Sequence, residues 1–261
     1  MGTAVQARVV RFLDSESSAG RILWLAVLIR LLLLVFVARD GLEGDSLDYQ
    51  RAAQSMADGR GMDTYWPPGL PLYEALVVSV FGKSAFWLRL AMVSWFIWLC
   101  HSFHDLAFRL HSRIAANLGL LFLAVYPEWI FQSVEPLSYL PAAALFMASL
   151  GFIRRHFEER RRATPWKAGI TLGVLVLFRP SALLLVLAIP LLFLFRRRQI
   201  LPGIMVCLVA GMVVGGWLTY AGIRSGRFIP VNDANARNLY LGNNAWTPGY
   251  KTWYYGSHWT G

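Results

Sequence analysis

Two carboxylates near the start of the chain, Asp45 and Asp48, have the residue type and the placement for chemistry at a membrane surface. They follow the first long apolar block and open the segment from Ser46 to Asp58, in which apolar residues recur at helical spacing up to a stop at Gly59. A carboxylate on such an interfacial helix can act as a general base toward an acceptor hydroxyl. Gly44-Asp45-Ser46 is also typical of a helix start, where Asp is a favoured N-cap. The local pattern leaves the two roles about equally open.

Two arginines indicate anionic partners. Arg179 precedes Pro180 at the expected outer boundary of a membrane segment, where an unpaired cation is costly. Because guanidinium binds phosphate oxygens in bidentate fashion, a lipid phosphate is one partner for Arg179, and water reached by snorkelling is the alternative. Arg30 lies in the middle of the first apolar block. We expect it to pair with an internal carboxylate or a bound phosphate.

Further polar side chains lie near expected membrane boundaries. Glu128 and Glu135 bracket a tight turn, and either could join Asp45, although carboxylates in turns are usually only solvated. A divalent metal could bind if Asp45 and Glu135 converge, but we do not favour one and expect no cofactor. His101 and His104 have helical spacing compatible with a metal pair, but no third ligand is in view. We interpret both histidines as interfacial residues.

Two loops combine aromatic and amide or proline residues. They are Trp66-Pro67-Pro68-Gly69 and the segment from Asn232 to Tyr250. Such side chains suit the hydroxyls and ring faces of a sugar. The aromatic belt of a membrane protein is the commoner use of Trp and Tyr and is the alternative.

The composition indicates that these residues are positioned by membrane helices. The chain is 56% hydrophobic and 15% charged, whereas soluble domains are roughly 45–50% apolar and about 25% charged. The net charge of +10 lies largely in short loops such as 154 to 167 and 196 to 198, where it sets orientation, so we do not expect nucleic acid as a partner. Cys100 and Cys207 both lie in apolar segments, which fits neither a disulfide framework nor a zinc pattern.

Seven apolar blocks are long enough to be candidate membrane spans. The first is interrupted by Arg30 and lacks a small-x-small cleavage site, so we interpret it as a retained helix rather than a signal peptide. The fifth and sixth are short for a hydrocarbon core of roughly 30 Å and could form two spans or one broken hairpin. The blocks cover residues 22–38, 86–107, 114–131, 136–153, 166–178, 181–195 and 200–222.

Arginine clusters predict the orientation of these spans. They precede the first span and follow the fourth and the sixth, so with seven spans all clusters fall on one side. The N-terminus is then cytoplasmic, and 39–85, 132–135, the Arg179 turn and everything after 223 are extracytoplasmic. We expect an all-α polytopic membrane protein with a membrane module over 1–222 and an extracytoplasmic segment over 223–261. The outer loop 39–85 should hold a second short helix from Pro71 to Phe81, ended by Gly82.

Four groups of residues, in order along the chain, carry a resemblance to a known family. They are Asp45-Ser46-Leu47-Asp48-Tyr49; Tyr65-Trp66-Pro67-Pro68-Gly69-Leu70-Pro71-Leu72-Tyr73; Glu135-Pro136-Leu137 with Phe178-Arg179-Pro180-Ser181; and Gly226-Arg227-Phe228-Ile229-Pro230-Val231 with Asn238-Leu239-Tyr240-Leu241-Gly242-Asn243-Asn244. Together they resemble the GT-C superfamily of polyprenyl-phosphate-sugar-dependent glycosyltransferases. The resemblance is to the dolichyl-phosphate-mannose protein mannosyltransferases and the bacterial aminoarabinose transferases in particular.

The resemblance implies roles for individual residues. Asp45 becomes the expected catalytic base, and Arg179 becomes a ligand for the donor phosphate. Ser46 replaces the second acidic residue of the family's signature, and Trp66 stands where the aminoarabinose transferases have a lysine. Members are usually longer, so we expect a short or truncated member. The remaining expected site residues are Asp48 and Glu135 as further carboxylates, and Arg237, Tyr49, Pro68, Asn243 and Asn244 as substrate-binding residues.

The function implied by the resemblance is sugar transfer with inversion. The sugar would move from a polyprenyl-phosphate carrier to an acceptor hydroxyl of unknown identity, on the extracytoplasmic face of a bacterial inner or plasma membrane. A different class of protein is the alternative, namely a lipid-carrier transporter or an assembly subunit with a decayed site. Transport should place polar residues inside several spans, whereas here the polar residues of interest fall almost wholly outside them.

Overall fold

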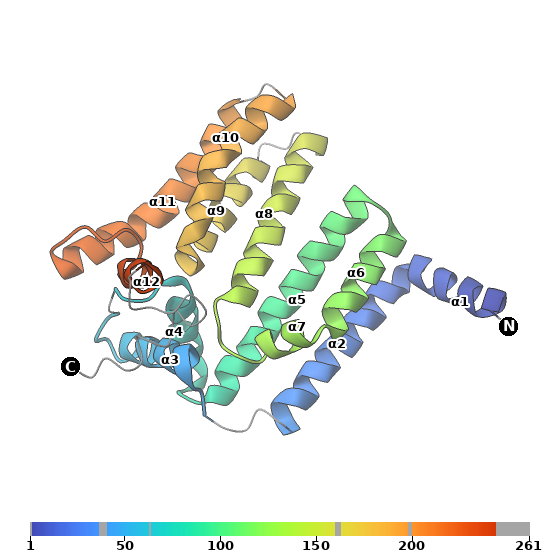
Figure 1. The fold of residues 1–261 in the computed structure, drawn as a ribbon, viewed down its shortest axis with the longest axis horizontal. Coiled ribbons are helices and arrows are strands. Elements are labelled where there is room, and N and C mark those ends of the chain that lie inside the picture. Colours follow the sequence, from blue (N-terminus) through green and yellow to red (C-terminus); the bar gives the residue numbers. More distant parts are fainter. Residues whose placement is uncertain (1, 37–40, 63, 160–162, 198–199, 244–261) are drawn as a thin grey trace.

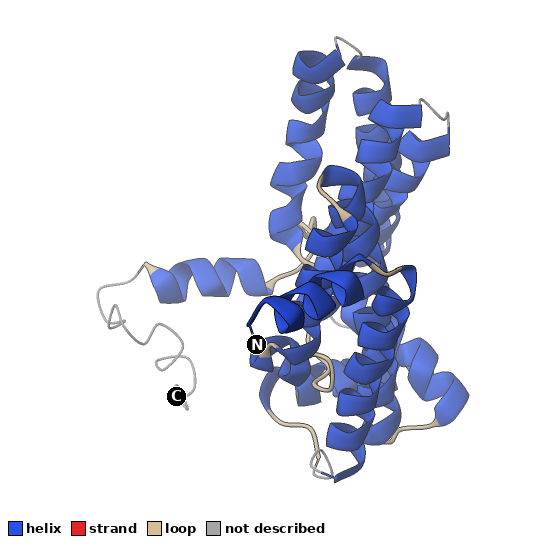
Figure 2. Cartoon of the chain, turned by 90° about the vertical axis from the view of Figure 1, so that its right-hand side faces the viewer, coloured by secondary structure: helices blue, strands red, loops and turns tan. Residues whose placement is uncertain are grey.

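Helices form all the regular structure that the computed structural model describes, which covers residues 2–36, 41–62, 64–159, 163–197 and 200–243. Figure 2 shows only helix and loop in these ranges. The all-α prediction is confirmed there. The elements are α1 (Gly2–Asp14), α2 (Glu16–Phe36), α3 (Gly44–Ala57), α4 (Gly69–Phe81), α5 (Ala85–Leu110), α6 (Arg113–Val125), α7 (Pro127–Gln132), α8 (Tyr139–Glu159), α9 (Ala163–Phe178), the short η1 (Pro180–Ala182), α10 (Leu183–Arg197), α11 (Ile200–Ser225) and α12 (Ala234–Gly242).

The long helices pack side by side, and short helices gather at one end of them. Neighbouring pairs are α5 with α8, α8 with α9, and α9 with α11, while α3 packs on α4. In Figure 1, α3 and α4 lie together near the ends of α9 and α11, and Figure 2 shows α12 projecting away from the bundle. Buried apolar side chains of α5, α8, α9 and α11 form one continuous core. This arrangement places α4, with α3 packed on it, against the ends of α5 and α9.

Each of the seven predicted blocks contains a helix, but the helices differ in length. Three helices in the described part, α2, α5 and α11, are long and apolar enough to cross a membrane. At 1.5 Å per residue, the 13 residues of α6 and the 16 of α9 span only about 20 and 24 Å, less than a hydrocarbon core of about 30 Å. A membrane protein is therefore supported by three helices, and seven crossings remain a prediction.

Pro127 divides the third predicted block, which was expected to run unbroken over 114–131. The helix α6 stops at Val125, and α7 begins at Pro127. Tyr126 between them is extended, with φ −68° and ψ 121°, because the residue before a proline is sterically excluded from the α region. The fourth helix begins at Tyr139 rather than at residue 136. The break leaves the last carbonyl groups of α6 without partners in their own helix.

Arg30 supplies hydrogen bonds to the broken end of α6. Its side chain is fully buried, at 0% exposure. The guanidinium donates to the carbonyl oxygens of Leu123 at 3.1 Å, Ala124 at 3.0 Å and Ala26 at 3.0 Å. It also lies 3.4 Å from the ring centroid of Phe96. The expectation of a carboxylate or phosphate partner was wrong, because the negative end of a neighbouring helix meets the charge instead.

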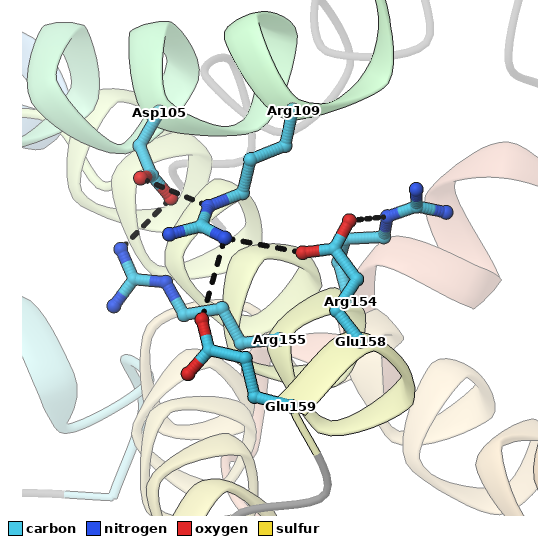
Figure 3. A network of polar contacts seen from close by, with 6 residues as sticks. All are labelled: Asp105, Arg109, Arg154, Arg155, Glu158 and Glu159. Carbon is cyan, nitrogen blue, oxygen red and sulfur yellow. Dashed lines mark hydrogen bonds and ion pairs between the residues drawn. The ribbon is translucent and has the colours of Figure 1, made fainter.

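A network of charged side chains joins the C-terminal ends of α5 and α8. Asp105 accepts from Arg109 at 3.1 Å and from Arg155 at 2.8 Å, so its carboxylate is engaged in ion pairs (Figure 3). His104 lies 3.1 Å from the side-chain oxygen of Asn117. These contacts give this end of α5 a structural role, and the membrane-boundary interpretation of His101 and His104 stays a prediction. The remaining members of the network are Arg154, Glu158 and Glu159.

Candidate functional site

Glycines follow the last turns of α3 and α4 and end both helices. Gly59 and Gly82 adopt φ values of +75° and +89°, a region that other residues rarely enter. Both predicted helices are confirmed to within two residues. Asp45 is the second residue of α3 and lies in its first turn, whereas the N-cap is Glu43. Asp45 is therefore not the N-cap of α3, as the sequence had allowed.

A polar cavity of about 290 Å³ lies beside the first turn of α3, and we call it the Asp45 cavity. Five chain segments line it: the start of α3, residues 66–67, the start of α8 with the residues before it, the turn after α9, and α12 with the residue Asn232 before it. Asp45 and Arg179 are thus brought to one cavity from positions far apart in the sequence. The polar lining consists of Asp45, Tyr49, Ser138, Arg179, Ser181, Asn232 and Asn238, and the aromatic lining of Trp66, Tyr139 and Phe178.

Asp45 lies at the mouth of this cavity. Its side chain remains open to solvent, yet neighbouring atoms cover enough of the carboxylate that burial raises its pKa, and the nearby charge of Asp48 raises that pKa further. The positive end of α3 acts in the opposite direction. A carboxylate whose pKa lies above the ordinary range is a stronger proton acceptor once ionised.

Tyr49 is fixed one turn further along α3. Its side chain is 6% exposed, and its ring centroid lies 5.0 Å from that of Trp66. Burial, only partly offset by a hydrogen bond with Ser138, raises the pKa of Tyr49 to about 12. Tyr49 therefore stays neutral at ordinary pH and presents a hydroxyl group next to Asp45.

Arg179 is held by its neighbours while its guanidinium is left available. The residue is extended, with φ −141° and ψ 96°, because Pro180 follows it. The guanidinium carbon lies 4.1 Å from the ring centroid of Tyr139. No ion pair of Arg179 occurs within the described part of the chain. Phosphate binding at this position would not require the breaking of a salt bridge.

The backbone of Arg179 is positioned by a close approach between α4 and α9. Phe178 is 3% exposed and packs edge-on against Trp95, with ring centroids 5.4 Å apart. A Cβ atom on Gly69 would lie 2.7 Å from Phe178 Cγ and 2.8 Å from its backbone nitrogen. Only glycine leaves room for this packing. The Trp66-Pro67-Pro68-Gly69 motif therefore contacts the segment that carries Arg179.

The segment after α11 is bound to the connection between α3 and α4 by several hydrogen bonds. The backbone N–H groups of Asp233 and Ala234 donate to the carbonyl oxygens of Thr64 at 2.8 Å and Tyr65 at 3.1 Å. The Asp233 carboxylate accepts from the Thr64 hydroxyl at 2.6 Å. Val231 has φ +72°, a conformation that is rare for a β-branched residue. Such local strain persists where surrounding contacts fix the chain, as they do here.

These bonds place Asn232 in the wall of the Asp45 cavity with an unused acceptor. The side chain is 3% exposed, and its amide nitrogen donates to the Tyr65 carbonyl oxygen at 3.1 Å. Its oxygen is buried and has no hydrogen-bond partner. An unsatisfied buried acceptor costs about 1–3 kcal/mol. A ligand hydroxyl that reached this oxygen would remove this cost, which makes Asn232 a candidate binding residue; the sequence indicated it only as the first residue of the segment from Asn232 to Tyr250.

Several expected site residues lie elsewhere. Asp48 lines a different cavity and lies 3.5 Å from Arg51. Pro68 is the N-cap of α4. Asn243 is the C-cap of α12 and donates to the Leu239 carbonyl oxygen at 2.8 Å. The side chain of Arg237 and the whole of Asn244 lie outside the described residues.

Glu135 belongs to a buried group next to the Asp45 cavity. Its carboxylate lies 3.6 Å from the Arg89 guanidinium. Glu74 of α4 is 1% exposed, and neither of its carboxylate oxygens has a hydrogen-bond partner. Burial, together with the charge of Glu135, raises the pKa of Glu74 well above the ordinary value. The isolated acid in the apolar run 69–81 was the signal for this residue, and the sequence analysis did not use it.

An apolar groove adjoins the Asp45 cavity. It has a volume of about 690 Å³, is lined by α9, α10, α11 and residues 228–231, and shares Pro180 and Ser181 with the cavity. A molecule with a polar head and a long apolar chain could occupy both at once. Among the described residues no group of three or more His, Cys, Asp or Glu side chains could hold a metal ion.

No family model, curated protein or solved structure matches the chain. The coarse class defined by the fold is a helical protein with helices able to cross a membrane.

Proposed function

We propose that the chain is a membrane glycosyltransferase of the GT-C type, which moves a sugar from a polyprenyl-phosphate carrier to an acceptor hydroxyl. One observation carries the proposal. Asp45 and Arg179 line the same polar cavity, and that cavity shares Pro180 and Ser181 with an apolar groove. A base, a phosphate ligand and a binding surface for a lipid chain are thus contiguous.

The donor fits this arrangement by its chemistry. The polyprenyl chain would occupy the apolar groove, and the phosphate would bind Arg179 at the junction. The sugar would lie in the Asp45 cavity, whose volume of about 290 Å³ is at the lower end of the range of about 300–1,000 Å³ for small-molecule sites. Asn232 would meet a sugar hydroxyl with its unused oxygen, and Trp66 would offer an aromatic face.

The transfer step follows from these positions. Asp45 accepts the proton of the acceptor hydroxyl while the acceptor oxygen forms a bond to the anomeric carbon. The bond between that carbon and the phosphate oxygen breaks, and polyprenyl phosphate leaves with the electron pair. Arg179 stabilises the negative charge on the leaving phosphate, so no general acid is required. Attack opposite the leaving group gives inversion. We place this reaction on the extracytoplasmic face of a bacterial inner or plasma membrane.

The experiment uses the full chain in detergent micelles with two readouts. Transfer is measured as release of undecaprenyl phosphate from a panel of undecaprenyl-phosphate sugars, and carrier binding as undecaprenyl phosphate bound in native mass spectrometry. We expect Asp45→Asn to lower transfer by at least about a hundredfold and to leave carrier binding unchanged. Arg179→Glu should weaken carrier binding.

Asp14→Asn is the matched control, because Asp14 is an exposed carboxylate of α1. It should change neither readout. Full transfer by the Asp45→Asn protein would refute the role of Asp45. Carrier binding without transfer in the unsubstituted chain would favour the non-catalytic alternative, a carrier transporter or an assembly subunit.

A further inference from the structure

A second outward cavity lies along another stripe of α3, and we call it the arginine cavity. Its volume is about 690 Å³. The residues of α3 that line it are Asp48, Arg51, Ala52 and Ser55, which are spaced by three and four positions and so form one helix face. Trp66 lines both this cavity and the Asp45 cavity. The two cavities are therefore neighbours that share one aromatic wall.

Positive charge dominates the lining. Arg51, Arg60 and Arg224 line the cavity together with one carboxylate, Asp48. Arg60 is paired with Asp58 at 3.0 Å, and Arg51 lies 3.5 Å from Asp48. Arg224 donates only to the Arg60 carbonyl oxygen, at 2.6 Å, and has no ion pair among the residues described. The cavity thus has an excess of guanidinium groups.

The backbone at Gly61 approaches the Arg224 guanidinium closely. A Cβ atom on Gly61 would lie 3.1 Å from the guanidinium carbon of Arg224 and 3.2 Å from the Tyr220 hydroxyl. Gly61 has φ +79°, so the outer loop turns there over the end of α11. Arg224 is exposed, and these neighbours leave its charge unneutralised, which favours binding of an anion.

The wall next to Arg224 is suited to a sugar ring. Tyr65 and Trp66 meet edge to face, with ring centroids 5.0 Å apart. The hydroxyls of Ser55, Thr64 and Ser225 also line the cavity. Aromatic faces, hydroxyls and guanidinium groups together match a saccharide that carries a phosphate group.

We propose that the arginine cavity binds a phosphorylated saccharide, with its phosphate on Arg224 and Arg51 and its ring on Tyr65 and Trp66. Its role as the acceptor site rests on the proposed function, because the acceptor hydroxyl would pass Trp66 to reach Asp45. Binding of the saccharide itself does not depend on transfer.

The test is direct binding of three soluble probes to the full chain in detergent micelles, measured by isothermal titration calorimetry. The probes are glucose 6-phosphate, glucose and inorganic phosphate. We expect glucose 6-phosphate to bind at least about tenfold more tightly than either of the others, because only it meets both the guanidinium groups and the rings. Equal affinity for glucose, or equal affinity for inorganic phosphate, would overturn the proposal.

Substitutions localise the site. Arg224→Gln and Arg51→Gln should each weaken glucose 6-phosphate binding by about tenfold, and Arg51→Gln removes a side chain that is 68% exposed and so leaves folding intact. Arg11→Gln, a change at an exposed arginine of α1, should have no effect. Unchanged affinity in both cavity variants would refute the site.

Two further comparisons distinguish a failure of the transfer hypothesis from a failure of the saccharide site. Asp45→Asn should retain glucose 6-phosphate binding, so loss of the transfer hypothesis would leave this site standing. The titration is repeated in nanodiscs of phosphatidylcholine with and without phosphatidylglycerol. The same affinity in both supports a saccharide site, whereas abolition of binding by phosphatidylglycerol would assign the arginines to lipid headgroups and overturn the proposal.

Discussion

The close approach of α4 to α9 at Gly69 can be tested by adding one methyl group. In Gly69→Ala, the new Cβ would lie 2.7 Å from Phe178 Cγ and 2.8 Å from its backbone nitrogen, whereas atoms in ordinary contact lie about 3.5–4.0 Å apart. The helices must separate by about 1 Å, because Phe178 is packed against Trp95 and cannot turn away. Overpacking of this kind costs about 1–3 kcal/mol.

The expected result is a drop in midpoint temperature of roughly 4–8 °C, for a loss of about 2 kcal/mol, measured by thermal unfolding in detergent micelles. Arg179 is adjacent to Phe178, so it should move with the separation. A misplacement of about 1 Å can lower the rate of an enzyme by roughly a hundredfold, and the transfer rate of Gly69→Ala should fall by up to that factor.

Gly216→Ala in α11 is the matched control. No atom lies within 4 Å of a Cβ at that position, and alanine favours a helix by up to about 1 kcal/mol over glycine. Its midpoint temperature should equal or exceed that of the unsubstituted chain. Normal midpoint temperature and normal transfer in Gly69→Ala would refute the reasoning that this contact positions Arg179.

Two buried ionisable residues, Arg30 and Glu74, give further predictions. Arg30→Met should lower the free energy of unfolding by about 2–4 kcal/mol, since it leaves carbonyl groups at the end of α6 unpaired. The control Arg21→Met, at an exposed position of α2, should change that free energy by less than about 0.5 kcal/mol. Both variants are measured by thermal unfolding, and equal effects would contradict the structural role of Arg30. Burial raises the pKa of Glu74 well above its ordinary value, so the folded state holds this proton more tightly, and stability should fall as pH rises from about 4.3 toward the raised pKa. In thermal unfolding measured over a series of pH values, Glu74→Gln should flatten that decline. A decline of the same steepness in the variant would contradict the role given to Glu74.

The helices could be predicted where residues close in sequence mark their ends or their apolar character. Gly59 and Gly82 marked the ends of α3 and α4, and the apolar blocks marked the long helices. The arginine rule also predicts the same side of the membrane for Asp45 and Arg179, which line one cavity; the side itself stays a prediction. These features depend on residues close in sequence or on a charge rule that applies to the whole chain.

The features that could not be predicted depend on contacts between distant segments. Arg30 bonds to a carbonyl 94 positions away, and that carbonyl is free only because Pro127 stops the helix. Asn232 bonds to Tyr65 across 167 positions. The helical spacing of Asp45 and Asp48 puts them on adjacent positions of one face, yet they line separate cavities. Trp66, which comes from another segment, lines both cavities, and no local pattern indicates that.

The two arginines noted in the sequence show how partners distinguish a structural charge from a functional one. Both lie near apolar segments, and residue type alone suggested phosphate for each. Arg30 is fully buried and its charge is met by helix carbonyls and an aromatic ring, so a ligand there would have to displace bonds that hold α2 to α6. Arg179 is half-buried beside a cavity, and its guanidinium meets only the face of Tyr139 among the contacts described. Loss of Arg30 should therefore reduce stability, whereas loss of Arg179 should reduce binding of the carrier phosphate at little cost in stability.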